Sequence, residues 1–320
     1  MPNLPEFSWT SWHGDPTLRA GLLLLAGLYL LGIGPIRRRY RLAAAVEPRQ
    51  VALFFSGIAL LFVALEGPLH DLSDHYLFSA HMLQHMFLTL FAPPLLLLGT
   101  PGWLLRPLIR PPLVRRVART LTGPLPALLL FNVLFTMSHF PVFYQKTLED
   151  HNVHVAEHLL FLATAVITWW PLLSPLPELP RLAYPLQLLY VFGQTFSGFL
   201  VGAFLTNTPR VLYPYYAAAP RVWGISPIDD QRLGGLLMWV AGGTFFLLVF
   251  SVIFFVWAHH DQLENDAAAA ADARPSVRPG LPLPVPRSAV ATARPPTIVG
   301  APLPGAHHVV QAAPDNSRLN

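Results

Sequence analysis

The chain contains no cysteine and few charged residues, and each scarcity excludes a class of protein or site. Without cysteine there is no disulfide bond, no thiolate metal site and no cysteine nucleophile, so any metal must bind to His, Met or oxygen ligands. Only 12% of the 320 residues are charged, whereas the surface of a soluble domain carries about a quarter to a third. Because 53% of the residues are hydrophobic and the mean hydropathy is +0.46, the sequence predicts an integral membrane protein and excludes a soluble enzyme.

Seven hydrophobic runs are long enough to cross a bilayer, which takes about 20 mostly apolar residues in a helix. We therefore expect an all-α bundle of seven transmembrane helices over residues 17–258. A short outer segment (1–16) precedes the bundle, and a disordered Pro- and Ala-rich cytoplasmic tail (259–320) follows it. The expected spans are residues 17–36, 51–69, 76–98, 125–143, 153–173, 182–205 and 233–258.

The distribution of arginine predicts the orientation of the bundle. All but one of the 21 basic residues are Arg, and five lie in each of the connections after the first and third spans, whereas the second connection has none. Basic residues favour the cytoplasmic side of a membrane, so we expect the N-terminus outside and the C-terminus inside. Topology thus explains the net charge of +4 better than a nucleic-acid partner does.

Histidines gather at one level of the predicted bundle. His81 and His85 lie four residues apart in the third span, and His154 and His158 repeat that spacing at the start of the fifth, so each pair shares one helix face. In the predicted orientation both pairs lie toward the outer side, as does His139 near the end of the fourth span. Ionisable groups within a bilayer are costly and commonly mark functional sites. The five imidazoles therefore predict a common metal site.

The residue types at this level favour copper. Imidazole suits copper, zinc or iron, thioether favours Cu(I), and carboxylate-poor surroundings disfavour magnesium and calcium. A b-type haem with His85 and His158 as axial ligands, in a membrane electron carrier, is a second hypothesis. A metal-free scaffold, in which the imidazoles only hold helices together by hydrogen bonds, is a third. Residues expected to support the site are Met82, Met86, Gln84, Glu157, Asp230 and Gln231.

Histidines in the connection before the third span, and two prolines within that span, predict further local features. The connection holds His70 and His75 with two aspartates, which indicates either an entry funnel for cations or a solvated hairpin. Pro93 and Pro94 lie far along the third span. Because proline lacks an N–H group and blocks the helical hydrogen bond, we expect them to break this span near its inner end. The half that carries His81 is expected to stay helical.

The stretch from Tyr76 to Pro101, YLFSAHMLQHMFLTLFAPPLLLLGTP, resembles the signature of the polytopic CtaG-type cytochrome c oxidase assembly factors. Four further stretches are similar to this family in the same order. They are WHGDP (12–16), SHFPVFY (138–144), HVAEHLLFLATAVITWWP (154–171) and DQRLGGLLMWV (230–240), which resemble the family's tryptophan and acidic-proline start, the end of span four, span five and the opening of the last helix. The resemblance extends over residues 9–258.

The resemblance implies a seven-helix protein of the bacterial plasma membrane that helps to mature a haem–copper oxidase, at the step where copper reaches the catalytic subunit. It implies an assembly factor and no enzyme, with that subunit and the lipid bilayer as partners; a homodimer is left open. The family's motif positions fall on His81, Gln84, His85, His139, His154, Glu157, His158, Asp230 and Gln231.

Overall fold

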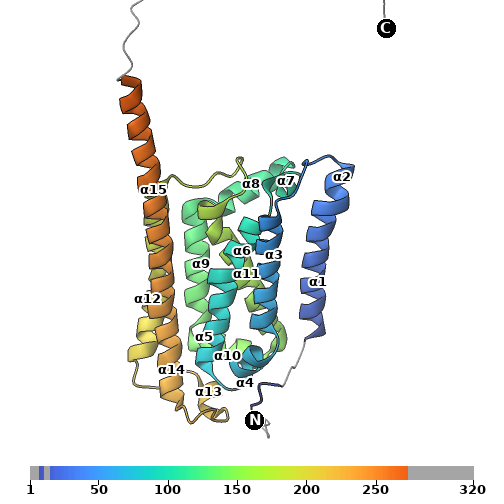
Figure 1. Cartoon of the computed structure of the whole chain (residues 1–320). Helices are drawn as coiled ribbons and strands as arrows, with labels where there is room; N and C mark the ends of the chain where they lie inside the picture. Colours follow the sequence, from blue (N-terminus) through green and yellow to red (C-terminus); the bar gives the residue numbers. More distant parts are fainter. Residues whose placement is uncertain (1–6, 11–14, 273–320) are drawn as a thin grey trace, which may run out of the picture. The chain divides into compact units, whose positions relative to one another are not determined.

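The computed structural model describes residues 7–10 and 15–272, and every regular element within these residues is a helix. The prediction of an all-α protein is therefore confirmed (Figure 1). The longer helices are α1 (Pro16–Leu31), α3 (Pro48–Leu65), α9 (Pro124–Ser138), α11 (His151–Leu173), α12 (Tyr184–Asn207) and α15 (Gly242–Asp272). The shorter ones are α2 (Arg37–Arg39), α4 (Pro68–His75), α5 (Phe78–Met86), α6 (Ala92–Gly99), α7 (Gly102–Leu105), α8 (Pro112–Leu121), α10 (Pro141–Glu149), α13 (Pro214–Ala218) and α14 (Pro227–Leu236). Three π-helical turns also occur, η1 (Gly32–Ile36), η2 (Phe87–Phe91) and η3 (Leu237–Ala241).

Six helical runs in the described part of the chain are long and apolar enough to cross a membrane. A seventh span exists if α8 and α9, which are bent by 66° at their junction, are counted as one. The fourth predicted span is shorter than expected, because α9 ends at Ser138 and α10 begins at Pro141. Proline favours the first turn of a helix, where its missing N–H group costs nothing. The six runs are Pro16–Arg39, Pro48–Leu65, Phe78–Gly99, His151–Leu173, Tyr184–Asn207 and Pro227–Ala270.

The expected break at Pro93 and Pro94 was wrong, because α5, η2 and α6 form one continuous span. Both prolines lie in the first turn of α6, directly after the widened turn η2. Pro93 has no N–H group to donate to the carbonyl of Thr89, four residues earlier. The indole Nε1 of Trp169 in α11 donates to that carbonyl instead, at 2.8 Å. A neighbouring helix thus satisfies the group that proline leaves unpaired, as is usual in membrane bundles.

This third span is also the most enclosed of the described spans. Two thirds of its hydropathy window (67%) is buried, against 11% for the first span. Its neighbours approach closely through glycine: a Cβ added at Gly99 in α6 would meet the backbone of Phe54 in α3. On the other side, a Cβ added at Gly234 in α14 would meet the ring of Phe78 in α5. Side chains of α5 therefore project into the interior of the bundle.

The connection before the third span is a helix and does not form a solvated hairpin. Residues 68–75 form α4, in which the side chains of Asp71 and Ser73 are buried against the rest of the protein. Hydrogen bonds from two tyrosines fix this helix: Tyr215 donates to the carbonyl of Asp74 at 2.7 Å, and Tyr216 to that of Ser73 at 2.6 Å. The hairpin interpretation was wrong because buried backbone groups in α4 are paired by α13.

The expected disorder of the tail was wrong for residues 259–272. Helix α15 continues through Asp272, well beyond the predicted end of the last span at residue 258. The segment DQLENDAAAAAD contains mostly strong helix formers, and alanine is the strongest of them. The rest of the predicted tail, 273–320, lies outside the described residues, as do residues 1–6 and 11–14 of the predicted outer segment.

Candidate metal centre

The structure brings the five predicted histidines together from three parts of the chain. Helix α5 supplies His81 and His85, helix α11 supplies His154 and His158, and His139 directly follows α9. Within each helix pair the ring centroids lie 4.3 Å apart. Between the helices, the rings of His81 and His154 are 5.3 Å apart and those of His85 and His158 are 5.4 Å apart. The ring of His139 lies 6.2 Å from that of His85. We call these five residues the histidine cluster.

The cluster contains buried polar atoms that have no hydrogen-bond partner. His81 and His85 are 0% and 2% exposed, respectively, so water does not reach their rings freely. Buried polar atoms almost always have a partner, and a group of exceptions in one place calls for an explanation such as a bound ion. The unpartnered atoms of the cluster are His81 Nε2, His85 Nδ1, His85 Nε2 and His139 Nε2; outside the cluster, Glu157 Oε2 on α11 and Gln84 Oε1 on α5 are unpartnered as well.

The spacing of the donor atoms fits a small metal ion. Two three-residue groups each present one donor atom per residue, with all three atoms within 4.8 Å of one another. The atoms His154 Nε2 and His158 Nε2 are 3.1 Å apart. Two nitrogens bound at about 2.0–2.1 Å to one tetrahedral metal lie about 3.3 Å apart, so this pair is almost at ligand spacing. The two groups are His81 with His154 and His158, and His81 with His85 and Glu157.

A tyrosine sets the tautomer of His81, which belongs to both groups. The Tyr216 hydroxyl donates to the carbonyl of Ser73 and lies 3.3 Å from His81 Nδ1. Burial raises the pKa of Tyr216 well above its usual value, so this hydroxyl keeps its single proton. Because that proton is used at Ser73, His81 Nδ1 must be the donor in the second contact. The lone pair of a neutral His81 then lies on Nε2, the unpartnered atom.

His139 and His154 have comparable partners at Nδ1. His139 Nδ1 donates to the carbonyl of Phe135 at 2.6 Å, which leaves its buried Nε2 with a lone pair. His154 Nδ1 lies 3.6 Å from a carboxylate oxygen of Asp74 in α4. In metal sites, a carboxylate or carbonyl that binds one ring nitrogen orients the other toward the metal. His81 and His139 therefore have the hydrogen-bond partner at Nδ1 that metal-binding histidines usually have, and His154 Nδ1 faces a carboxylate at ion-pair distance.

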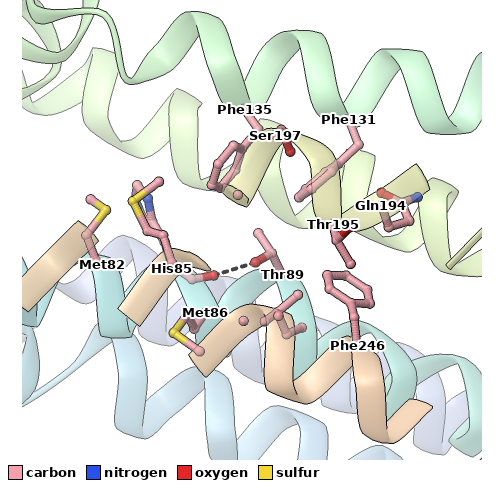
Figure 2. Close-up of a pocket in the computed structure, with 15 residues that line it drawn as sticks. Met82, His85, Met86, Thr89, Phe131, Phe135, Gln194, Thr195, Ser197 and Phe246 are labelled. Carbon is pink, nitrogen blue, oxygen red and sulfur yellow. Dashed lines mark hydrogen bonds between the residues drawn. The ribbon is translucent and has the colours of Figure 1, made fainter. Parts of the chain in front are cut away.

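The two predicted methionines lie beside His85. Met82 and Met86 line a small pocket of about 40 Å³ together with His85 (Figure 2). Met82 also packs in a buried aromatic cluster with Phe78 and Tyr144. In the same view the Thr89 hydroxyl donates to the main-chain carbonyl of His85 at 2.7 Å. The thioethers contribute packing around the cluster, and His85 is the member that faces them.

Three other predicted residues position helices and make no described contact with the cluster rings. Gln84 Nε2 donates to the carbonyl of Ala64 at 2.9 Å and to His70 Nδ1 at 3.1 Å. The Asp230 carboxylate accepts hydrogen bonds from the first turn of α5. Gln231 Oε1 accepts from the backbone N–H of Leu212 at 2.7 Å. Their roles are to hold α5, α4 and the chain before α13 in register.

Sequence reasoning did not resolve the place of His70 and did not identify His151. The ring of His70 lies 6.5 Å from that of His154, and its Nε2 lies 3.5 Å from Asp74, whereas the ring of His75 packs edge-on against Tyr76. His151 precedes His154 and His158 by three and seven residues, so it shares their helix face. That spacing was the available signal for His151.

The Tyr216 hydroxyl is expected to control metal affinity through His81. Tyr216→Phe keeps the ring volume but removes the acceptor of His81 Nδ1–H, and loss of such a partner typically costs 10–100-fold in metal affinity. Copper affinity of the purified variant, measured by competition with a chelator, should fall by about that factor. Tyr215→Phe is the matched control, because its hydroxyl binds the Asp74 carbonyl and touches no cluster ring. Equal affinities in the two variants would contradict this role.

Comparison with known proteins shows the family. The family model for the cytochrome c oxidase caa3 assembly factor matches residues 27–260. Uncharacterized proteins of Mycobacterium bovis and Mycobacterium tuberculosis are each 28% identical to the chain over 269 residues, which is 79% of this chain and 40% of theirs. An uncharacterized protein of Mycobacterium leprae is 28% identical over 278 residues, or 81% of this chain and 41% of its own length.

The chain thus spans about two fifths of the length of these curated relatives. No solved structure matches it. The family match covers the third span, both pairs of cluster histidines and the opening of α14, which are among the stretches on which the sequence resemblance rested. The chain is a multi-pass membrane protein and belongs to the cytochrome c oxidase caa3 assembly factor family.

Proposed function

We propose that this protein holds a copper ion in the histidine cluster and passes it to the catalytic subunit of a haem–copper oxidase during assembly. The observation that carries the proposal is the set of buried, unpartnered donor atoms centred on His81 and His85. The ion is cargo, so the protein acts as a metallochaperone and catalyses no reaction. Family membership supplies the link to the oxidase.

Copper is the cargo that best fits the donor set. Five imidazoles are borderline donors that suit copper or zinc and outnumber the single hard carboxylate, and the soft thioethers of Met82 and Met86 beside His85 are compatible with Cu(I). Hard cations such as Mg²⁺ and Ca²⁺ need mostly oxygen ligands, which the cluster does not offer. The two three-residue groups share His81, so an ion can exchange one set of ligands for the other without leaving that residue. Such an exchange suits a cargo that must be released.

A haem is less well supported by the same geometry. Axial imidazoles on a haem stand on opposite faces of a flat macrocycle, which needs a wide slot between the two rings. The ring of Phe161 lies 4.8 Å from that of His85 and the ring of His81 lies 4.3 Å from it, and the adjoining pocket of about 40 Å³ is too small for a haem. We therefore propose copper and treat a haem as an outcome of the test.

We further propose that the cluster lies toward the outer side of the bacterial plasma membrane. The arginine-rich connections 37–49 and 106–119 precede α3 and follow α6, whereas His81 lies near the beginning of the third span. These connections therefore belong to the opposite end of the span from the cluster. The positive-inside rule supports a cytoplasmic location for the arginines and an outer location for the cluster.

The double variant His81→Ala with His85→Ala tests the function. It removes the only residue common to both donor groups together with its helix partner. Cells that depend on this protein should then lose oxidase activity, and the purified variant should lose its copper, while its amount in the membrane stays normal. The matched control is His259→Ala with His260→Ala, an exposed pair in the second half of α15.

The outcomes separate the alternatives. Normal copper content and normal oxidase activity in the cluster variant would refute the proposal. A Soret band in the purified wild-type protein that disappears in the variant would identify a haem protein instead. Undiminished binding of oxidase subunits by a wild-type protein that never contains metal would identify a scaffold.

A further inference from the structure

A chamber of about 400 Å³ is lined mainly by residues of α1, α3 and α11, and it reaches the histidine cluster at His154 and His158. The chamber has a polar and an aliphatic side. The polar side is formed by α11 and presents His151, His154 and His158, with His70 nearby. The aliphatic side comes mainly from leucines of α1 and α3. Two members of the cluster, His154 and His158, thus form part of the chamber surface.

The histidines of α11 form a ladder from the outside of the protein to its interior. They recur at intervals of three and four residues, so they follow one helix face. The side chain of His151 is 69% exposed and that of His154 only 9%. His158 contacts both His154 and His85, with ring centroids 4.3 and 5.4 Å away. His151 is exposed, His154 is buried and His158 is partly buried, so the ladder leads from an exposed rim to the buried rings of α5.

The rim of the chamber carries a carboxylate beside the first imidazole. An Asp15 carboxylate oxygen lies 3.5 Å from His151 Nε2. A hydrogen bond from the Thr17 hydroxyl lowers the pKa of Asp15, which keeps this carboxylate charged at neutral pH. A negative charge next to an exposed imidazole attracts cations and supplies two ligands at the entrance.

The aliphatic side of the chamber restricts which cations can pass. Leucine side chains cannot replace the water of a hydrated ion, and the cost of removing that water is high for hard cations. A cation that exchanges water for imidazole, in contrast, finds the next ligand on the same face of α11 at each turn. The chamber thus offers a path to copper or zinc and a barrier to sodium or magnesium.

We propose that this chamber is the route along which the metal ion enters the cluster, with Asp15 and His151 as its first ligands and His154 and His158 as the following ones. The inference rests on the proposed function, because it presumes that the cluster binds a metal. It adds an entry site that lies outside the cluster and a wall, α1, that lines the route.

Two glycines in α1 allow the route to be tested without disturbing the ligands. Gly21 lines the chamber, and a Cβ built on it meets no atom within 4 Å. Gly27 lies on the same helix, has the same free space, and does not line the chamber. Gly21→Leu therefore fills the path. Gly27→Leu adds the same side chain to α1 but leaves the path open.

The experiment measures the rate at which Cu(I)-loaded protein in lipid nanodiscs transfers its copper to bicinchoninate. Gly21→Leu is expected to slow transfer by about tenfold or more, with unchanged copper per protein at equilibrium. Gly27→Leu is expected to keep the wild-type rate. As an independent variant at an exposed position, His151→Ala should slow loading from dilute copper several-fold and leave the final copper content unchanged.

The outcomes distinguish the route from the site. Copper transfer at equal rates in Gly21→Leu and Gly27→Leu would overturn the route while leaving the metal cluster intact, as would an unchanged loading rate in His151→Ala. A wild-type protein that takes up no copper would overturn both the route and the proposed function. Loss of bound copper in Gly21→Leu at equilibrium would also count against the route, because it would show that the substitution damages the cluster itself.

Discussion

Purified His81→Ala protein is expected to bind copper at least ~100-fold more weakly than the wild type, because it loses a direct ligand. Loss of a partner that only orients a ligand already lowers metal affinity by about 10–100-fold. His81 belongs to both three-residue donor groups, and its removal leaves only two donors in each. His158→Ala and Glu157→Gln each leave one group complete. Those two variants should therefore lose affinity by a smaller factor, about tenfold each.

Competition with a chromophoric Cu(I) chelator of known affinity measures all three variants on one scale. His75→Ala provides the control, since its ring packs against Tyr76 outside the cluster. An equally large loss in His158→Ala and His81→Ala would show that the donors act as a single set and not as two alternatives. Wild-type affinity in His81→Ala would remove the basis of the proposed function.

The sequence predicted the helices and the level of the histidines for a simple physical reason. Apolar runs of membrane length must be helical because the backbone has no other partner in lipid, and position along such a run fixes depth. His85 and His158 lie at matched positions in their spans, and the structure places their rings 5.4 Å apart. Depth alone does not say which helices are neighbours, so the contact between α5 and α11 needed the structure.

The parts that sequence patterns did not reveal depend on contacts between distant segments. Trp169 pairs with the carbonyl that Pro93 leaves open, so a local rule about proline gave the wrong prediction. Tyr216 binds His81 across 135 residues of chain, and no spacing rule connects them. His151 was different, because its spacing to His154 on α11 was visible in the sequence. A rule that considers only pairs four residues apart does not include it, because His151 and His154 are three residues apart.

Asp230, which was expected to support the metal site, caps the N-terminus of α5 and makes no described contact with the cluster rings. Helix α5 begins after Leu77, which has no side chain able to cap the helix. The Asp230 carboxylate, on α14, caps the helix instead. It accepts a hydrogen bond from the N–H of Phe78 at 2.7 Å, and two more from the N–H and the hydroxyl of Ser79 at 3.0 and 2.6 Å. The helix that carries two cluster histidines is thus capped from another span.

Asp230→Ala is expected to destabilise the protein by about 3 kcal/mol or more, since each buried donor left unpaired costs about 1–3 kcal/mol. Phe78 and Ser79 are 1% and 5% exposed, so water does not replace the carboxylate. Asp230→Asn should lose less, because asparagine is also a good helix cap. The thermal midpoint of the detergent-solubilised protein measures the effect, and copper affinity should fall with it because α5 carries His81.

The neighbouring residue Asp229 gives the matched control for this prediction. Its side chain is 64% exposed, pairs with Arg232 and accepts a hydrogen bond from the Ser226 hydroxyl at 2.6 Å; the exposed ion pair and the hydrogen bond contribute about 1 kcal/mol each at most. Asp229→Ala should therefore lower the thermal midpoint much less than Asp230→Ala and leave the copper affinity almost unchanged. If Asp230→Ala proved as stable as Asp229→Ala, the N-terminus of α5 would not depend on the cap from α14. The position of His81 and His85 would then have to be fixed by the close packing of the third span alone.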